Sequence, residues 1–259
     1  MDLASAPDFS IHGNKYFLTI VDDYTRYGWV LFMKDKASVF QTFLYWYKMI
    51  KNIFHKNIKF IKSDNGTEFI NANFKNFINE NGIVHEDTIR YSPQQNGRVE
   101  RLHGTLVSNA NAMLRDAKLH HKFWEDAVAT ANYLHNRLPH KGNNKKVPYE
   151  LLYGQPVDYN KLKVFGCQVY YYIPKQLRKK FNNTTHPGIF IGYDEVNHTT
   201  YKIYDTIDNK IILACAVIFF EDEPANIPAP LSNPTYQNFL PYYEVGGMST
   251  KMNLLAKKN

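Results

Sequence analysis

The sequence predicts an α/β protein in which a mixed sheet flanked by helices is followed by a small all-β barrel and a disordered tail. Up to about residue 150, runs of β-branched and aromatic residues alternate with segments of helical periodicity, which is typical of a sheet covered by helices. Residues 163–222 hold four or five short apolar runs separated by turn signals, which indicates a small barrel. Five prolines between Pro224 and Pro241 indicate a linker or a disordered end.

The expected division of the chain follows these changes in composition. We expect residues 1–150 to form the α/β core, residues 151–223 the small β domain, and residues 224–259 a proline-rich linker or tail. A chain of 259 residues with 44% hydrophobic residues is long enough for two such domains, each with its own core.

The first part of the core is predicted to be a hairpin, a helix and a strand. Residues 15–34 contain two β-forming runs around the polar turn 22–26, which predicts the hairpin. Residues 58–64 form a short apolar run, which predicts a strand ending at Asp64. Between them, apolar residues recur at helical spacing and predict an amphipathic helix: Phe40, Phe43, Leu44, Tyr47 and Ile50.

The rest of the core is predicted to be one more strand and three helices. A short helix around Phe74 ends at Asn81-Gly82, and residues 83–88 predict the next strand. A further helix is expected over residues 123–138. Before it, the apolar face of a long helix comprises Val99, Leu102, Leu106, Ala110, Met113, Leu114 and Ala117.

Charge and cysteine content narrow the class of protein. The net charge of +7 favours a polyanionic partner. Cys167 and Cys215 both lie in apolar strand-like runs, so we expect buried free thiols and a reducing compartment. No apolar run approaches the roughly 18 residues of a membrane span and no signal peptide is visible, so we expect an intracellular protein without membrane contact.

Three acidic residues stand at the ends of predicted elements. Asp2 precedes the hairpin, Asp64 ends a strand, and Glu100 lies on the first turn of the long helix. An aspartate before Asn-Gly is ordinary turn chemistry, since such side chains commonly bind a backbone amide. Taken together, however, the three carboxylates offer the hard oxygen ligands that magnesium prefers.

Four segments resemble a known family. "GNKYFLTIVDDYTRYGWV", "KSDNGTEF" and "YSPQQNGRVERLHGTL" are similar to the integrase core of LTR retrotransposons of the Ty1/copia type (Ty5-like). "VFGCQVYYYIPKQLRKKFNNTTHPGIFIGYD" resembles the small SH3-like domain that follows this core in copia-type polyproteins. The resemblance extends from residue 2 to about residue 222 and implies an RNase H-like fold for the core.

The resemblance also implies an activity and a set of site residues. Asp2, Asp64 and Glu100 match a metal-binding triad that holds two Mg²⁺ or Mn²⁺ ions, with no small-molecule cofactor. The implied reaction is integration: water trims a DNA end, and the resulting 3′-hydroxyl then attacks target DNA. Tyr91 and Asn96 match positions that contact DNA near the reacting phosphate. Double-stranded DNA is the expected partner, and a homo-oligomer is expected in the active state, in the nucleus and cytoplasm.

Several alternative assignments stay open. Asp22 and Asp23 are rivals of Asp2 for the first ligand, although turn acids are the ordinary case. Glu68 is either an outer carboxylate of the site or a solvated acid, and the tyrosines at 170–172 are either barrel core or a base-stacking surface. A basic loop of the small domain is either merely solvated or in contact with phosphate: Lys175, Arg178, Lys179 and Lys180.

The chain departs from the family pattern in two places. It begins one residue before Asp2, so we expect a truncated first strand that holds the acid loosely. The family helix reads Glu-Arg, then Asn and a basic residue, whereas this helix reads Glu100-Arg101-Leu102-His103-Gly104. The alternatives to an active integrase core are therefore a catalytically inactive DNA-binding remnant and, with less support, a cellular RNase H-like nuclease.

Overall fold

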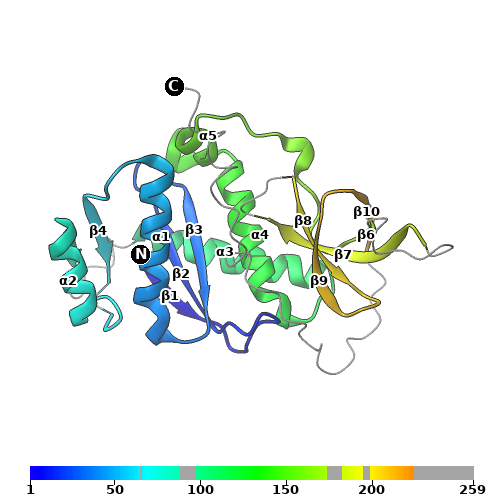
Figure 1. The fold of residues 1–259 in the computed structure, drawn as a ribbon. Coiled ribbons are helices and arrows are strands. Elements are labelled where there is room, and N and C mark those ends of the chain that lie inside the picture. Colours follow the sequence, from blue (N-terminus) through cyan, green and yellow to red (C-terminus); the bar gives the residue numbers. More distant parts are fainter. Residues whose placement is uncertain (65, 88–96, 174–182, 195–198, 225–259) are drawn as a thin grey trace.

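The structure is a computed structural model with an α/β core and a small β domain packed side by side (Figure 1). The residues that it describes are 1–64, 66–87, 97–173, 183–194 and 199–224. The predicted α/β class and the small all-β region are both confirmed. The tail predicted over residues 225–259 lies outside the described residues.

The core has two sheets, one antiparallel and one parallel. Three antiparallel strands run in the order β1-β2-β3, and two parallel strands form the pair β4-β5. The Met1 amino group donates a hydrogen bond of 2.6 Å to Lys62 O, which joins the start of β1 to β4. The strands are β1 (Asp2–Ser5), β2 (Tyr16–Val21), β3 (Gly28–Met33), β4 (Phe60–Ser63) and β5 (Val84–Asp87).

Strand β1 corrects the element order that residue patterns predict. The hairpin, β4 and β5 lie where they are expected, but the patterns contain no strand before the hairpin. Asp2 is not loosely held, because β1 pairs with β2 over its whole length and sets Asp2 opposite Thr19. Four residues are too few for a periodic pattern, so this strand is formed by its pairing with β2.

Helices cover both faces of the three-stranded sheet β1-β2-β3 (Figure 1). Leu18 and Ile20 of β2 pack with α1 and α2 on one face, while Phe17 packs with α3 and α4 on the other, as the period of two along a strand requires. The helices are α1 (Val39–Phe54), α2 (Ala72–Asn81), α3 (Gly97–Asp116), α4 (Trp124–Arg137) and α5 (Pro148–Tyr153). Short 3₁₀ helices occur at η1 (Lys36–Ser38), η3 (His121–Phe123), η4 (Lys141–Asn143) and η5 (Tyr159–Lys161).

Helix α2 shows how local sequence sets the ends of an element. The Asn71 side chain accepts a hydrogen bond from Phe74 N and caps the first turn. Gly82 follows the last turn with φ 62, a left-handed conformation in which glycine avoids a Cβ clash. The stop predicted at Asn81-Gly82 is confirmed.

The small domain is one five-stranded antiparallel sheet in the order β10-β6-β7-β8-β9. The apolar run 210–222 forms two strands, and Cys215 lies in the connection between them. Cys167 is buried as predicted, but Cys215 is exposed, so the prediction of a second buried thiol is wrong. The strands are β6 (Cys167–Tyr172), β7 (Thr185–Tyr193), β8 (Tyr201–Asp205), β9 (Lys210–Ala214) and β10 (Val217–Pro224).

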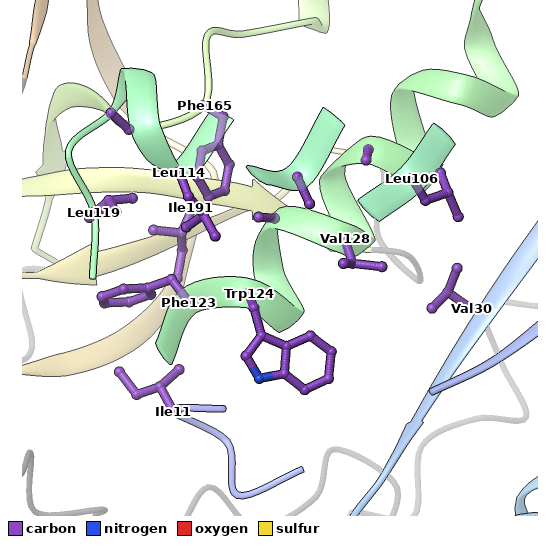
Figure 2. Packing of buried hydrophobic residues seen from close by; sticks show 14 of the residues in the cluster. Ile11, Val30, Leu106, Leu114, Leu119, Phe123, Trp124, Val128, Phe165 and Ile191 are labelled. Carbon is purple, nitrogen blue, oxygen red and sulfur yellow. The ribbon is translucent and has the colours of Figure 1, made fainter. Parts of the chain in front are cut away.

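The core and the small domain share one hydrophobic cluster. Figure 2 shows Phe165 and Ile191 of the small-domain side among Leu114, Phe123 and Trp124 of the core helices. Beside this cluster, the Tyr133 ring of α4 stacks on the Tyr193 ring of β7, with centroids 3.8 Å apart. The small domain also has a cluster largely of its own, which includes Cys167, Val169, Phe190 and Ile203, and the shared cluster joins it to the core. The domain boundary at residue 150 stays a prediction.

A substitution at Gly104 tests the energetics of α3. Gly104 is exposed in the helix interior, and a Cβ there would meet no atom within 4 Å. Gly104→Ala should raise the free energy of unfolding by about 0.5–1 kcal/mol, because alanine loses less backbone entropy on folding. Urea unfolding followed by circular dichroism measures the change.

The matched control is an alanine at a crowded glycine. A Cβ at Gly28 would lie 2.8 Å from both Leu102 Cδ2 and Asn132 Oδ1, so Gly28→Ala should lower the unfolding free energy. An unfolding free energy that fell in Gly104→Ala as well would contradict the open-space assignment.

A buried ion pair makes the stability depend on pH. His12 Nε2 lies 3.0 Å from both carboxylate oxygens of Asp126, which is 1% exposed. Burial acts to lower the pKa of His12, but the charge and hydrogen bond of Asp126, with the charge of Glu125, outweigh it and raise the pKa to about 8. Lys202 of β8 opposes this rise.

The raised pKa fixes the direction of the pH dependence. The stabilisation by charged His12 is complete below the unfolded-state pKa of 6.5 and is lost as the pH rises through about 8. The unfolding free energy should thus fall by about 2 kcal/mol between pH 6 and 9, measured by urea unfolding at each pH. His12→Gln should flatten this slope, and an equally steep slope in the variant would assign it to other groups.

Candidate active site

The three acids stand on three different elements of the core. Asp2 begins β1 and its side chain is 21% exposed. Asp64 directly follows β4, and Glu100 is exposed on the first turn of α3. The Met1–Lys62 hydrogen bond sets the beginning of β1 beside β4, which brings the chain at Asp2 toward the chain at Asp64.

The charges of Asp64 and Glu100 both act on the Asp2 carboxyl. Burial raises the pKa of Asp2, and the charges of Asp64 and Glu100 raise it further. His103 and the Met1 amino group act in the opposite direction. Asp2 therefore lies within electrostatic range of both other acids, in a region where a cation would relieve their repulsion.

The donor chemistry of these residues fits a divalent cation of the magnesium class. Carboxylate oxygens are hard ligands, and three of them supply enough negative charge for Mg²⁺ or Mn²⁺. Within the part of the chain that the structure describes, no three His, Cys, Asp or Glu side chains lie close enough together to hold a metal. The assignment of the triad as metal ligands therefore remains a prediction.

His103 is a polar neighbour of Asp2 to which the sequence analysis gave no role. Its Nδ1 lies 3.9 Å from Asp2 Oδ2 and 3.4 Å from the Thr19 hydroxyl. Its ring stacks flat on Phe17, with centroids 4.8 Å apart and planes 2° from parallel. Burial lowers the pKa of His103, against the opposing charge of Asp2. Its spacing of three residues from Glu100 was a signal that both lie on one face of α3.

The rival acids Asp22 and Asp23 are engaged elsewhere. Asp22 accepts hydrogen bonds of 2.7 Å from both the backbone N and the hydroxyl of Thr25, which is the turn role expected of it. Asp23 accepts hydrogen bonds from Arg98 and Arg26, and these lower the pKa of its carboxyl. These contacts favour Asp2 as the first acid of the set.

Three other polar residues near Asp64 in the sequence or on β5 contact side chains of β4 or of the segment that follows it. Glu86 of β5 forms an ion pair of 3.7 Å with Lys62, and both side chains are exposed. His85 is 2.8 Å from the Ser63 hydroxyl. Glu68 is half-buried, with its carboxylate close to the Thr67 hydroxyl.

The predicted DNA contacts fall largely outside the described residues. This is so for Tyr91, Asn96, Lys175, Arg178, Lys179 and Lys180. Of the tyrosines at 170–172, Tyr171 is buried and forms barrel core, and it donates a 2.5 Å hydrogen bond to Asp205. Tyr172 is 50% exposed, so the barrel-core assignment does not hold for that residue. In the described part of the chain, no helix is long and apolar enough to cross a membrane.

Comparisons with known proteins agree on two families. The family described as "Integrase core domain" matches residues 1–93, which include Asp2 and Asp64, and the "Retroviral polymerase SH3-like domain" family matches residues 167–232.

Two relatives come from plant transposons. The Retrovirus-related Pol polyprotein from transposon TNT 1-94 of Nicotiana tabacum is 37% identical over 234 residues, which is 89% of this chain. The corresponding polyprotein from transposon RE2 of Arabidopsis thaliana is 34% identical over 192 residues, or 74% of this chain. The chain spans 18% and 13% of the lengths of these two relatives.

A solved structure also shows similarity. The integrase-containing intasome of simian T-cell lymphotropic virus, in complex with a regulatory subunit of PP2A, aligns with a TM-score of 0.47 and 16% identity. The alignment covers 84% of this chain and 76% of that chain.

Proposed function

The chain carries a retroviral-type integrase core and an SH3-like domain and has plant retrotransposon Pol polyproteins as homologues, and on this premise we propose that it is the DNA-integrating part of such a polyprotein. The subtype we propose is copia. The activity is that of a polynucleotidyl transferase, which trims the 3′ end of element DNA and joins it to host DNA.

The observation that carries this proposal is the contact of the chain beside Asp2 with strand β4, which leads into Asp64, within the region that matches the integrase core family. Asp2, Asp64 and Glu100 come from positions 2, 64 and 100 of the chain, yet the charges of Asp64 and Glu100 both raise the pKa of Asp2. Stability alone does not favour such an arrangement, because the mutual repulsion of carboxylates is unfavourable. A site for divalent cations accounts for it, and the integrase core family match covers the first two acids.

Different residues of the chain would bind the metal ions and position the ligands in the proposed site. Asp2, Asp64 and Glu100 would hold magnesium or manganese, which when bound stabilises the attacking and leaving oxygens at the reacting phosphate. Backbone pairing of β1 with β2 fixes the main chain at Asp2. Helix α3 presents Glu100 from its first turn. Each carboxylate has to stay ionised, because only the charged form is a strong ligand for these cations.

The proposed partner is double-stranded DNA, both as element ends and as target. The net charge of +7 provides the long-range attraction to phosphate. By the resemblance, Tyr91 and Asn96 would contact DNA near the reacting phosphate. From its charge, the basic loop with Lys175, Arg178, Lys179 and Lys180 would contact the DNA backbone. We propose that the active form is a homo-oligomer acting in the nucleus after synthesis in the cytoplasm.

Conservative substitution of the acids tests the metal-site assignment. Asp64→Asn and Glu100→Gln should each reduce joining of a labelled DNA end to a plasmid, with Mn²⁺ present, to less than a few per cent of the wild-type level. DNA binding should stay nearly unchanged, because these side chains are assigned to metal and not to duplex. A gel assay measures joining, and a filter assay measures binding.

Glu86→Gln is the matched control, because it also converts an exposed carboxylate near β4 to an amide. It should leave joining intact. Substantial joining by Asp64→Asn or Glu100→Gln would overturn the assignment of the triad. A wild-type chain that binds DNA but joins no ends with either metal would instead be a non-catalytic DNA-binding remnant.

Salt dependence tests the mode of DNA binding. If phosphate contacts dominate, the logarithm of the affinity should fall roughly linearly with the logarithm of the salt concentration. Fluorescence anisotropy with two duplexes of unrelated sequence measures this slope for each. An affinity that is indifferent to salt, or a strong preference for one duplex, would contradict binding through the phosphate backbone.

A further inference from the structure

We infer that His103 is a positioning residue that orients the Asp2 carboxylate toward the metal site, and this inference rests on the proposed role of Asp2 as a ligand. His103 Nδ1 lies between the Thr19 hydroxyl, at 3.4 Å, and Asp2 Oδ2, at 3.9 Å. The three residues come from β2, α3 and β1, so the arrangement depends on the packing of α3 against the sheet.

The Phe17 ring packs against the face of the His103 imidazole and limits its movement. Phe17 is 3% exposed, and the imidazole lies parallel to its ring, with centroids 4.8 Å apart. Parallel stacking at this separation restricts rotation of the imidazole out of that plane. The ring edge that carries Nδ1 is thereby held toward β1 and β2.

The Thr19 hydroxyl forms a hydrogen bond with Nδ1 at the edge of the His103 ring. Thr19 is fully buried, and in the pairing of β1 with β2 it lies directly opposite Asp2. A buried hydroxyl needs a hydrogen-bond partner, and His103 Nδ1 is the partner that the structure gives it. The same nitrogen lies 3.9 Å from the carboxylate of the neighbouring strand.

A role in orienting a ligand follows from the polarity of these contacts. An apolar side chain would fill the space over Phe17 as well as an imidazole does, but it would offer nothing to Thr19 or Asp2. Polar groups that surround a metal ligand influence its orientation, and loss of such outer partners typically costs about 10- to 100-fold in metal affinity. At 3.9 Å the contact of His103 with Asp2 is electrostatic and longer than a hydrogen bond. Glu100 and His103 are three residues apart, so one helix face both supplies a proposed ligand and orients another.

Three variants of the full chain separate positioning from packing. His103→Phe keeps an aromatic ring over Phe17 but removes the polar edge. His103→Asn loses the ring but can place an amide nitrogen near the site of Nδ1. Thr19→Val keeps the shape of the side chain and removes the hydroxyl. Calorimetry with Mn²⁺ alone measures metal affinity, and thermal unfolding without metal measures stability.

We expect the substitutions to change the Mn²⁺ affinity and the melting temperature differently. His103→Phe should weaken Mn²⁺ binding by about 10- to 100-fold while its melting temperature stays near that of the wild type. His103→Asn should bind Mn²⁺ more tightly than His103→Phe despite melting lower. Thr19→Val should weaken binding in the same direction as His103→Phe.

The reference variant Asp2→Asn distinguishes the two possible failures. If Asp2→Asn weakens Mn²⁺ binding and His103→Phe does not, the positioning role is overturned and the ligand assignment stands. If Asp2→Asn leaves Mn²⁺ binding unchanged, the proposed ligand and the positioning role both fall. Should His103→Phe not fold, Thr19→Val decides the question, because unchanged Mn²⁺ affinity there overturns the role of Nδ1.

Discussion

Helix α4 is the element on which the arrangement of both domains depends, because its buried polar side chains contact each domain. On the core side, Asn136 and Asn132 donate hydrogen bonds of 2.8 and 3.0 Å to Gly28 O, and Asn136 also accepts one from Gly28 N. These bonds satisfy backbone groups at the start of the edge strand β3. On the other side, the Thr130 hydroxyl donates to Ile191 O of β7. Unpaired buried groups are costly, so these contacts set the position of α4 against both sheets.

The same helix holds a cation without a carboxylate partner among the contacts described. Arg137 is 6% exposed, and its guanidinium lies 3.4 Å from the Tyr133 ring centroid and 4.5 Å from that of Tyr149. Tyr133 in turn stacks on Tyr193 of the small domain. Stacking of a guanidinium on aromatic faces partly replaces its hydration. The small domain is thereby anchored by a specific stack in addition to the shared apolar cluster.

The proposed site combines rigid positioning with unfavourable charge. Asp2 is set by strand pairing, and its neighbours Thr19, Phe17 and His103 are set by the packing of α3 on the sheet. The remaining acids lie at element ends, where the backbone is less constrained. Repulsion among the three carboxylates disfavours their close approach when no cation is bound.

Sequence alone determined most of the local elements and supplied the candidate residues of the proposed site. Helical periodicity and turn residues act over a few positions, which is why α2 and its stop at Gly82 could be predicted. The resemblance implied a short first strand at Asp2, but only the tertiary structure decided that this strand pairs along its length with β2, that Cys215 is exposed, and that Arg98 binds Asp23. It alone placed His103 beside Asp2, since Thr19 and His103 are 84 positions apart. The physical reason is that contacts between residues far apart in the sequence form when whole helices and strands pack together. Patterns read over a few neighbouring residues cannot predict that packing.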